Sequence, residues 1–304
     1  MLRSVARWVV QGRPSHGRSP SRAGPTSPAD SRTWFRLLCS GQRRFCSETR
    51  MMNAITVQSI DPQKDPKTGK RKRPGPDALK LARVPIPQVG DNDVLIKVHA
   101  AGVNRPDVLQ RMGLYPPPSG HSEIIGLEVS GTVVARGDSV PDPKHEPGLD
   151  VGAPVLALTN GGGYAEYCKV PYGQCLPVPE NMDMLNAGCV AETFFTVWHN
   201  LFQQANIFGQ KLKRGDSVLI HGGTSGIGMT AIQLAKAKGI TVFATAGSTK
   251  KCNACETFGA EAVINYKTED FAERVHELTG GEGVNLVLDM VAGSYLAKNL
   301  ESCA

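Results

Sequence analysis

The second half of the chain alternates short apolar runs with longer amphipathic stretches. The apolar runs predict buried strands, and the stretches between them repeat apolar positions at helical spacing. Such an alternation indicates a parallel, doubly wound α/β sheet. The predicted strands are 217–221, 241–246, 262–264 and 284–290, and the predicted helices are 226–238, 250–258 and 269–279.

The first half has a different texture, with shorter strands and closely spaced glycines and prolines. This pattern favours an antiparallel, partly closed β-barrel. A helical apolar period over 185–203 then begins the second unit. We therefore predict two folded domains, 51–178 and 179–304. The strands expected in the first are 53–58, 78–84, 93–101, 129–136 and 151–158.

Residues 1–50 differ from both halves. They are rich in Arg and Ser, contain no Lys, and include only Asp30 and Glu48 as acids. These features are typical of a mitochondrial transit peptide, which would direct the protein to the matrix. The alternative is a disordered or mistranslated extension before a start at Met51 or Met52, which would leave the protein in the cytoplasm.

Charge and hydropathy exclude two classes of function. The net charge is +6, but the excess lies in the leader, so specific nucleic-acid binding gains no support. No apolar run is long enough to predict a membrane-spanning helix.

A glycine-rich loop joins the first strand of the second half to its helix. The segment 221–228 reads His-Gly-Gly-Thr-Ser-Gly-Ile-Gly. Small residues allow a tight turn and close approach of the backbone to a pyrophosphate, while the helix N-terminus offers free N–H groups. We therefore predict a Rossmann dinucleotide site; the alternative is a strand–helix turn without a ligand. The expected cofactor contacts here are Gly223, Ser225, Gly226, Ile227 and Gly228.

The end of the second strand distinguishes between the two nicotinamide cofactors. NAD-binding sites usually place Asp or Glu there, but this chain has Ala246, Gly247 and Ser248, with Lys251 following. A hydroxyl, free N–H groups and a cation suit a 2′-phosphate, so the cofactor predicted is NADPH. The alternative reading treats the lysine as part of a helix's first turn, where the helix dipole disfavours it.

Three motifs carry a family resemblance. Residues 102–118 (GVNRPDVLQRMGLYPPP), 125–131 (IGLEVSG) and 285–290 (NLVLDM) resemble the zinc-independent NADPH:quinone oxidoreductases of the medium-chain dehydrogenase/reductase superfamily. Within these zeta-crystallin-like proteins, the tumour-suppressor-inducible subgroup is the most similar. The resemblance implies a GroES-like first domain, a Rossmann second domain, and reduction of a quinone or related conjugated carbonyl.

The resemblance also implies that no metal takes part. Asn104 stands where zinc-dependent relatives have Cys, and Leu127 stands where they have His. Cys252 and Cys255 form a single C-x-x-C without further ligands, so we expect reduced thiols. Without a Lewis acid, the chemistry left is direct hydride delivery to an electron-poor acceptor.

Four site residues follow from the resemblance. It implies that Asn104 and Tyr115 line the acceptor pocket, that Thr196 lies on the nicotinamide side, and that Tyr266 lies near the adenosine phosphate. Structural roles are the alternatives: Asn104 as a turn residue, Tyr115 as a loop anchor, and Thr196 as a packing hydroxyl.

Two further hypotheses remain open. An enoyl-thioester reductase would use the same fold and cofactor on another conjugated carbonyl. The chain also stops after four predicted strands, whereas the doubly wound fold has six. We therefore expect an incomplete second domain, a doubtful homodimer, and, as the alternative to an active enzyme, a truncated isoform or gene-model fragment with at most partial cofactor binding.

Overall fold

The computed structural model describes residues 49–58, 73–141, 148–205, 209 and 211–304. The proposed leader, 1–50, lies almost wholly outside the described residues, so its targeting role remains a prediction. In the part of the chain that is described, no helix has the length and apolar character needed to cross a membrane.

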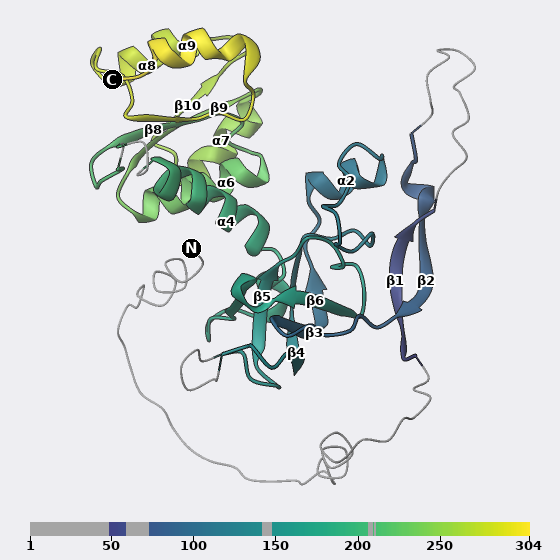
Figure 1. The fold of residues 1–304 in the computed structure, drawn as a ribbon. Helices are drawn as coiled ribbons and strands as arrows, with labels where there is room; N and C mark the ends of the chain where they lie inside the picture. The colour runs from purple at the N-terminus through teal and green to yellow at the C-terminus, as the bar shows by residue number, and fades with distance from the viewer. Residues whose placement is uncertain (1–48, 59–72, 142–147, 206–208, 210) are drawn as a thin grey trace, which may run out of the picture.

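The first half is antiparallel (Figure 1). Strands β1 (Met51–Val57) and β2 (Leu79–Pro85) form a two-stranded ribbon, which the Ala54–Ala165 bridge links to the main sheet. The five-stranded sheet has the order β6-β3-β4-β5-β7. Its strands are β3 (Asp93–Ala101), β4 (Glu128–Arg136), β5 (Pro154–Leu158), β6 (Tyr167–Pro171) and β7 (Cys175–Pro177).

Alternating apolar positions build the core of this sheet. Val94 and Ile96 of β3 are fully buried, and they belong to a cluster that includes Val129, Val155 and Val170 from three neighbouring strands. Residues two positions apart therefore point into this cluster, while the intervening Leu95 is buried on the opposite face of the strand. Two register shifts between β3 and β4 bend the sheet.

Helix α2 (Arg105–Arg111), which the sequence analysis did not predict, connects β3 to the segment before β4. Pro106 lies in its first turn, where its missing N–H costs nothing. Asp107 accepts a hydrogen bond from the Asn104 backbone N–H at 2.7 Å. Asn104 is thus the N-cap residue of a short helix, which confirms a turn-forming role at this position.

The second half is the expected parallel sheet, with strand order β10-β9-β8-β11. The order is the 3-2-1-4 arrangement of the doubly wound fold. The strands are β8 (Ser217–Ile220), β9 (Thr241–Ala246), β10 (Ala262–Asn265) and β11 (Leu286–Leu288). The helices between them are α6 (Gly226–Ala237), α7 (Thr249–Phe258) and α8 (Phe271–Leu278).

Helices cover both faces of this sheet (Figure 1), with α8 and α9 (Leu296–Glu301) on one side and α6 and α7 on the other. Successive residues of β8 pack against the helices on opposite faces of the sheet. Val218 and Ile220 belong to the cluster with α6 and α7, whereas Leu219 packs with Phe271 of α8. A strand buried on both faces explains the unbroken apolar run in the sequence.

Two predicted elements differ from the structure. The helix expected over 185–203 is divided into α3 (Met184–Ala187) and α4 (Ala191–Trp198), and the latter continues as the π-helix η4 (His199–Gln204). The division falls at Gly188, where a Cβ would lie 2.8 Å from the Ala100 Cβ. The strand expected over 284–290 is confined to β11 because Asp289 starts a turn.

Apolar contacts connect the segments on either side of residue 178. Leu156 and Leu176 of the first sheet pack against Ala191, Phe195 and Trp198 of α4. Helix α4 also packs against α6. It therefore joins the antiparallel sheet to the Rossmann unit.

Candidate active site

The glycine loop, residues 221–228, lies at the carboxyl end of the parallel sheet. It follows β8, which pairs with β9 on one side and β11 on the other. Because the chain order reverses between these two neighbours, the loop stands at the topological switch point, where open α/β sheets bind ligands.

Steric contacts explain the glycines of this loop. A Cβ on Gly228 would lie 2.4 Å from the Gly222 carbonyl oxygen, and a Cβ on Gly223 would lie 2.7 Å from the Cys255 Sγ. Gly222 also has a φ of +64°, which favours glycine. The loop can therefore form only with minimal side chains at these positions.

The start of α6 presents free backbone donors. Ser225 is the N-cap residue, and its Oγ accepts a hydrogen bond from the Gly228 N–H at 2.9 Å. The N–H groups of Gly226 and Ile227 have no acceptor among the described residues. Free N–H groups at the positive end of a helix form an anion site.

The end of β9 lies beside the start of α7 and the end of β10. A Cβ on Gly247 would lie 2.7 Å from the Tyr266 hydroxyl, and the Tyr266 N–H donates to the Ala246 carbonyl at 3.2 Å. Ser248 is the N-cap residue of α7, and its side chain makes no capping bond. Lys251 is exposed in the first turn of α7. The structure thus brings these predicted contacts together at one corner of the sheet.

A buried polar chain that the sequence analysis missed supports the glycine loop. His221 is fully buried; its ring nitrogens lie 3.1 Å from Thr245 Oγ1 and 2.8 Å from Asn299 Oδ1. Thr245 accepts from the Gly222 N–H through Oγ1 and from the Gly223 N–H through its carbonyl. Burial lowers the pKa of His221, which favours the neutral ring. In the sequence, the position of His221 at the end of an apolar strand was the signal that could have indicated this buried polar chain.

The turn after β11 lies against the same loop. Asp289 accepts from the backbone N–H groups of Val291 and Ala292 at 2.7 and 3.0 Å, and its other oxygen accepts from Asn299. The Ser225 hydroxyl lies 3.4 Å from the Met290 Sδ. Ala292 has a φ of +57°, an uncommon conformation for a residue with a side chain. The turn is therefore held in place by hydrogen bonds despite local strain.

In the first domain, Glu128 links Asn104, a predicted site residue, to Glu192 at the start of α4. Its Oε1 accepts from the Asn104 side-chain amide at 2.8 Å, and its Oε2 accepts from the Glu192 backbone N–H at 2.9 Å. Glu128 is 2% exposed, and a Cβ on Gly102 would overlap its carboxylate. The acid within the apolar segment IIGLEVSG was the signal for this contact.

Two more carboxyl groups extend this network. Asp107, also buried, accepts from the Tyr164 hydroxyl at 2.9 Å, and burial beside this carboxylate raises the pKa of Tyr164. Burial together with the charges of Glu128 and Asp107 raises the pKa of Glu192 to about 7. Burial also raises the pKa of Glu128. Burial therefore favours the protonated form of both Glu128 and Glu192.

Helix α4 connects the two sides. Thr193, at its first turn, lies 3.4 Å from the Cβ position of Gly226, and its Oγ1 accepts from Thr230 of α6 at 3.1 Å. Thr196, one turn later, donates its hydroxyl to the Glu192 carbonyl at 2.6 Å. The hydroxyl of Thr196 is thus used within the helix, although its oxygen can still accept a hydrogen bond.

Tyr115 lies in the turn region after α2. Its side chain is 49% exposed and makes no hydrogen bond to any described residue. The ring is therefore free to contact a bound molecule, and it does not anchor the loop through its hydroxyl.

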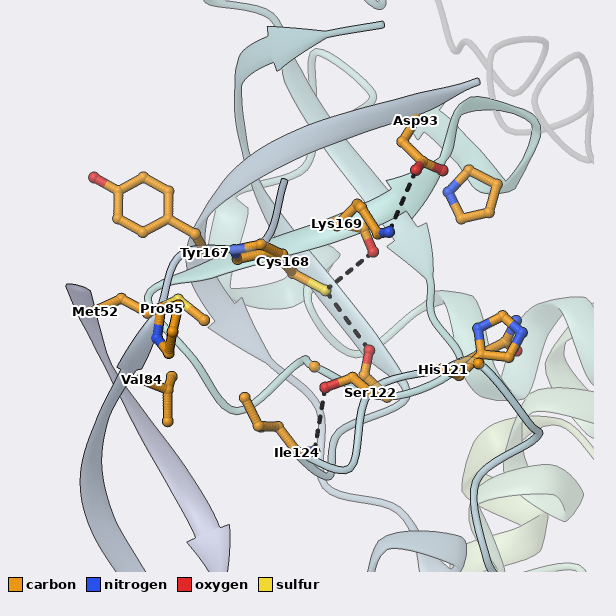
Figure 2. A pocket seen from close by; sticks show the side chains of 16 residues that line it. Met52, Val84, Pro85, Asp93, His121, Ser122, Ile124, Tyr167, Cys168 and Lys169 are labelled. Carbon is orange, nitrogen blue, oxygen red and sulfur yellow. Dashed lines mark hydrogen bonds and ion pairs between the residues drawn. The ribbon is translucent and has the colours of Figure 1, made fainter. Parts of the chain in front are cut away.

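A cavity of about 400 Å³ lies elsewhere on the first half (Figure 2). Met52 and Val84 of the β1–β2 ribbon form one wall, and Cys168 and Lys169 of β6 form another, with Ser122 below. None of the predicted site residues lines it. Among the residues that the structure describes, no group of three or more His, Cys, Asp or Glu side chains is arranged to hold a metal ion.

Comparisons with known proteins agree with both halves of the fold. The alcohol dehydrogenase GroES-like domain family matches residues 90–180, and the zinc-binding dehydrogenase family matches residues 226–304. Human quinone oxidoreductase is 31% identical over 229 residues, which are 74% of this chain and 66% of the human protein. A polyketide synthase subunit of Mycobacterium tuberculosis is 33% identical over 228 residues, 75% of this chain and 10% of that one.

Solved structures show the same relationship. A mycobacterial quinone oxidoreductase has a TM-score of 0.67 at 32% identity, over 83% of this chain and 71% of that one. Escherichia coli quinone oxidoreductase complexed with NADPH has a TM-score of 0.66 at 25% identity, over 83% and 70%. The CurK enoyl reductase has a TM-score of 0.68 at 26% identity, over 84% and 71%. The chain therefore belongs to the quinone oxidoreductase family of the medium-chain dehydrogenase/reductases.

Proposed function

We propose that this protein transfers hydride from NADPH to a quinone or a related conjugated carbonyl without a metal. The proposal rests on one arrangement. The glycine loop, residues 221–228, lies at the switch point of the parallel sheet, and the neighbouring end of β9 carries no acidic residue. In this proposal the acceptor contacts residues of the predicted domain 51–178, and the cofactor contacts residues of the predicted domain 179–304.

The described residues fit a dinucleotide phosphate. A Cβ on Gly228 or Gly223 would collide with neighbouring protein atoms, so the tight turn before α6 requires glycine at both positions. The N–H groups of Gly226 and Ile227 at this turn have no acceptor among the described residues. We assign the pyrophosphate to these groups, with Ser225 holding the helix start. NADPH supplies a hydride when bound.

The corner formed by β9 and β10 supports NADPH over NADH. Ser248 keeps its hydroxyl free of a capping bond, and Lys251 adds a positive charge where a helix dipole disfavours one. A 2′-phosphate would satisfy both groups through charge-assisted hydrogen bonds. Gly247 admits the Tyr266 ring, which we place against the adenosine. The E. coli relative solved with NADPH supports the same choice.

On the acceptor side, the chain supplies position and hydrogen bonds. We assign Asn104 and Tyr115 to the acceptor pocket and Thr196 to the nicotinamide side. Asn104 is held by Glu128, so its amide is oriented before an acceptor arrives. Tyr115 keeps its hydroxyl available for an acceptor oxygen.

Reduction of an enoyl thioester is the second candidate, because the CurK enoyl reductase has a TM-score of 0.68 to this chain. The two candidates use the same cofactor and differ in the acceptor. A thioester brings a long pantetheine arm, whereas a quinone is compact and flat. Acceptor preference therefore separates them.

The test is turnover by the full chain with 1,4-benzoquinone and with crotonyl-thioester, each with NADPH and NADH. We expect NADPH oxidation that depends on the quinone and is slower with either NADH or the thioester. Faster turnover of the thioester would favour the second candidate. If the protein binds NADPH but turns over no acceptor, the reductase proposal is refuted. Only the alternative of a cofactor-binding protein without reductase activity then remains.

A further inference from the structure

Asn299 of α9 connects the glycine loop to the turn that follows β11. Its side-chain oxygen, Oδ1, lies 2.8 Å from His221 Nε2, and its amide nitrogen, Nδ2, donates to Asp289 Oδ2 at 2.9 Å. His221 begins the loop, and Asp289 holds the turn through the backbone N–H groups of Val291 and Ala292. One side chain from a helix therefore contacts two segments at the carboxyl end of the sheet.

The hydrogen bonds of this group run in one direction. Three N–H groups donate to the Asp289 carboxylate and favour its charged form, so Asn299 faces it with the amide and faces His221 with the oxygen. That oxygen can only accept, which places the ring proton on His221 Nε2. Burial lowers the pKa of His221, so Nδ1 of the neutral ring accepts the Thr245 hydroxyl at 3.1 Å. The Thr245 oxygen then accepts the Gly222 N–H at 3.2 Å.

We propose that Asn299 is a positioning residue for the cofactor, acting through His221 and Thr245 on the backbone of the glycine loop. This inference rests on the proposed function, which assigns the cofactor pyrophosphate to that loop. Asn299 selects the Nε2–H tautomer of His221. In this tautomer the Thr245 hydroxyl donates to the ring, and its oxygen is left for the loop.

The chain of hydrogen bonds sorts the N–H groups of the loop into two sets. Gly222 and Gly223 donate inward to Thr245, to Oγ1 at 3.2 Å and to the carbonyl at 2.9 Å. The N–H groups of Gly226 and Ile227 have no acceptor among the described residues and are available to an anion. Holding the first part of the loop therefore determines where the remaining donors lie.

At its other end, Asn299 holds the turn after β11 against the same loop. Met290 of this turn places its Sδ 3.4 Å from the Ser225 hydroxyl and 3.7 Å from the Cβ position of Gly222. Asp289, which Asn299 contacts, is the residue that orders the turn. The loop and the turn are thus held in one arrangement by a single amide.

Burial makes each member of the chain difficult to replace. His221 and Thr245 are fully buried, and Asn299 is 6% exposed. The His221 ring makes edge contacts with Phe271 and Tyr295, at centroid distances of 4.8 and 4.9 Å. Because bulk water does not reach these groups, the loss of one member leaves its neighbours unpaired.

Asn299→Leu and Thr245→Val test this role, because each keeps the approximate size and removes the hydrogen bonds. Each should weaken NADPH binding about tenfold in a fluorescence titration of the full chain. Thr245→Ser retains the hydroxyl and should bind NADPH more tightly than Thr245→Val. The matched control is Val275→Ala, which removes packing from the same buried layer beside Phe271 and should keep the wild-type affinity. Circular dichroism checks that each variant is folded.

A spectroscopic measurement separates positioning from packing. The nitrogen chemical shifts of the histidine rings, in the full chain labelled at histidine, report which ring nitrogen carries the proton, and the spectrum of His221→Gln identifies the signals of His221. We expect the Nε2–H tautomer in the wild type and in Val275→Ala, and loss of this preference in Asn299→Leu.

Two results overturn the positioning role alone: an Nδ1–H tautomer of His221 in the wild type, or wild-type NADPH affinity in folded Asn299→Leu and Thr245→Val. If the wild type binds no NADPH, the proposed function fails and this role fails with it.

Discussion

The side-chain amide of Asn104 donates to Glu128 Oε1 across 2.8 Å, joining the N-cap of α2 to the first residue of β4. The same carboxylate holds the first turn of α4. One buried acid thus fixes the position of a predicted acceptor residue and of the helix that touches the glycine loop. This arrangement couples the two sides of the site.

Glu128→Gln should destabilise the protein and disturb the acceptor side. A Gln has one acceptor oxygen, so its amide must face one of two N–H donors, which leaves buried groups unpaired at a cost of about 1–3 kcal/mol. Urea unfolding measures this loss, with the exposed Glu123→Gln as control. Equal stability of the two variants would show that the carboxylate is not needed as a double acceptor.

Gly228→Ala should abolish NADPH binding. Its Cβ would meet the Gly222 carbonyl oxygen at 2.4 Å, so the loop must open and its N–H groups must move apart. Gly173→Ala is the control, because no atom lies within 4 Å of its Cβ position. Fluorescence titration with NADPH measures both variants, and circular dichroism checks that each is folded. Wild-type affinity in a folded Gly228→Ala protein would place the cofactor elsewhere.

Ser248→Ala and Lys251→Ala should each weaken NADPH about tenfold and leave NADH unchanged. Each removes one partner of the proposed 2′-phosphate, and a charge-assisted bond contributes about 1.4 kcal/mol or more. The control is Lys80→Ala on β2, an exposed lysine in the first half. If both variants lose NADPH and NADH affinity equally, the phosphate assignment is wrong.

His221 predicts an acid-sensitive component of stability. Burial lowers its folded-state pKa below the unfolded value near 6.5, so the unfolded chain takes up a proton first as the pH falls. The unfolding free energy should therefore decrease as the pH drops below about 6.5. In His221→Gln this component should vanish from the difference between pH 7.5 and pH 5.5, two values chosen on either side of about 6.5. An unchanged difference would mean that folding does not lower the pKa of His221.

Features that depend on residues close together in the sequence could be predicted from it. The residues of the glycine loop are adjacent in the chain, and Gly228 and Ser225 meet within one helical turn. The strand order followed from the alternation of strands and helices. The break at Gly188 was not predicted; Gly188 packs closely against Ala100 of β3, a contact between segments far apart in the sequence.

Long-range polar contacts could not be predicted in the same way. Glu128 binds groups that lie 24 and 64 positions away in the sequence, and His221 binds Asn299 across 78. A lone acid or histidine in an apolar segment signals that a partner exists, because burial without one is costly. It does not say which residue that partner is.

The equilibrium affinity for NADPH and NADH tests the central claim most directly. Fluorescence titration of the full chain with each cofactor requires no acceptor. The glycine loop predicts that both cofactors bind saturably. Because Ser248 and Lys251 stand where NAD-binding sites have an acid, we expect the dissociation constant for NADPH to be the lower of the two. No saturable binding of NADPH, or NADH affinity equal to or above that of NADPH, would contradict the account.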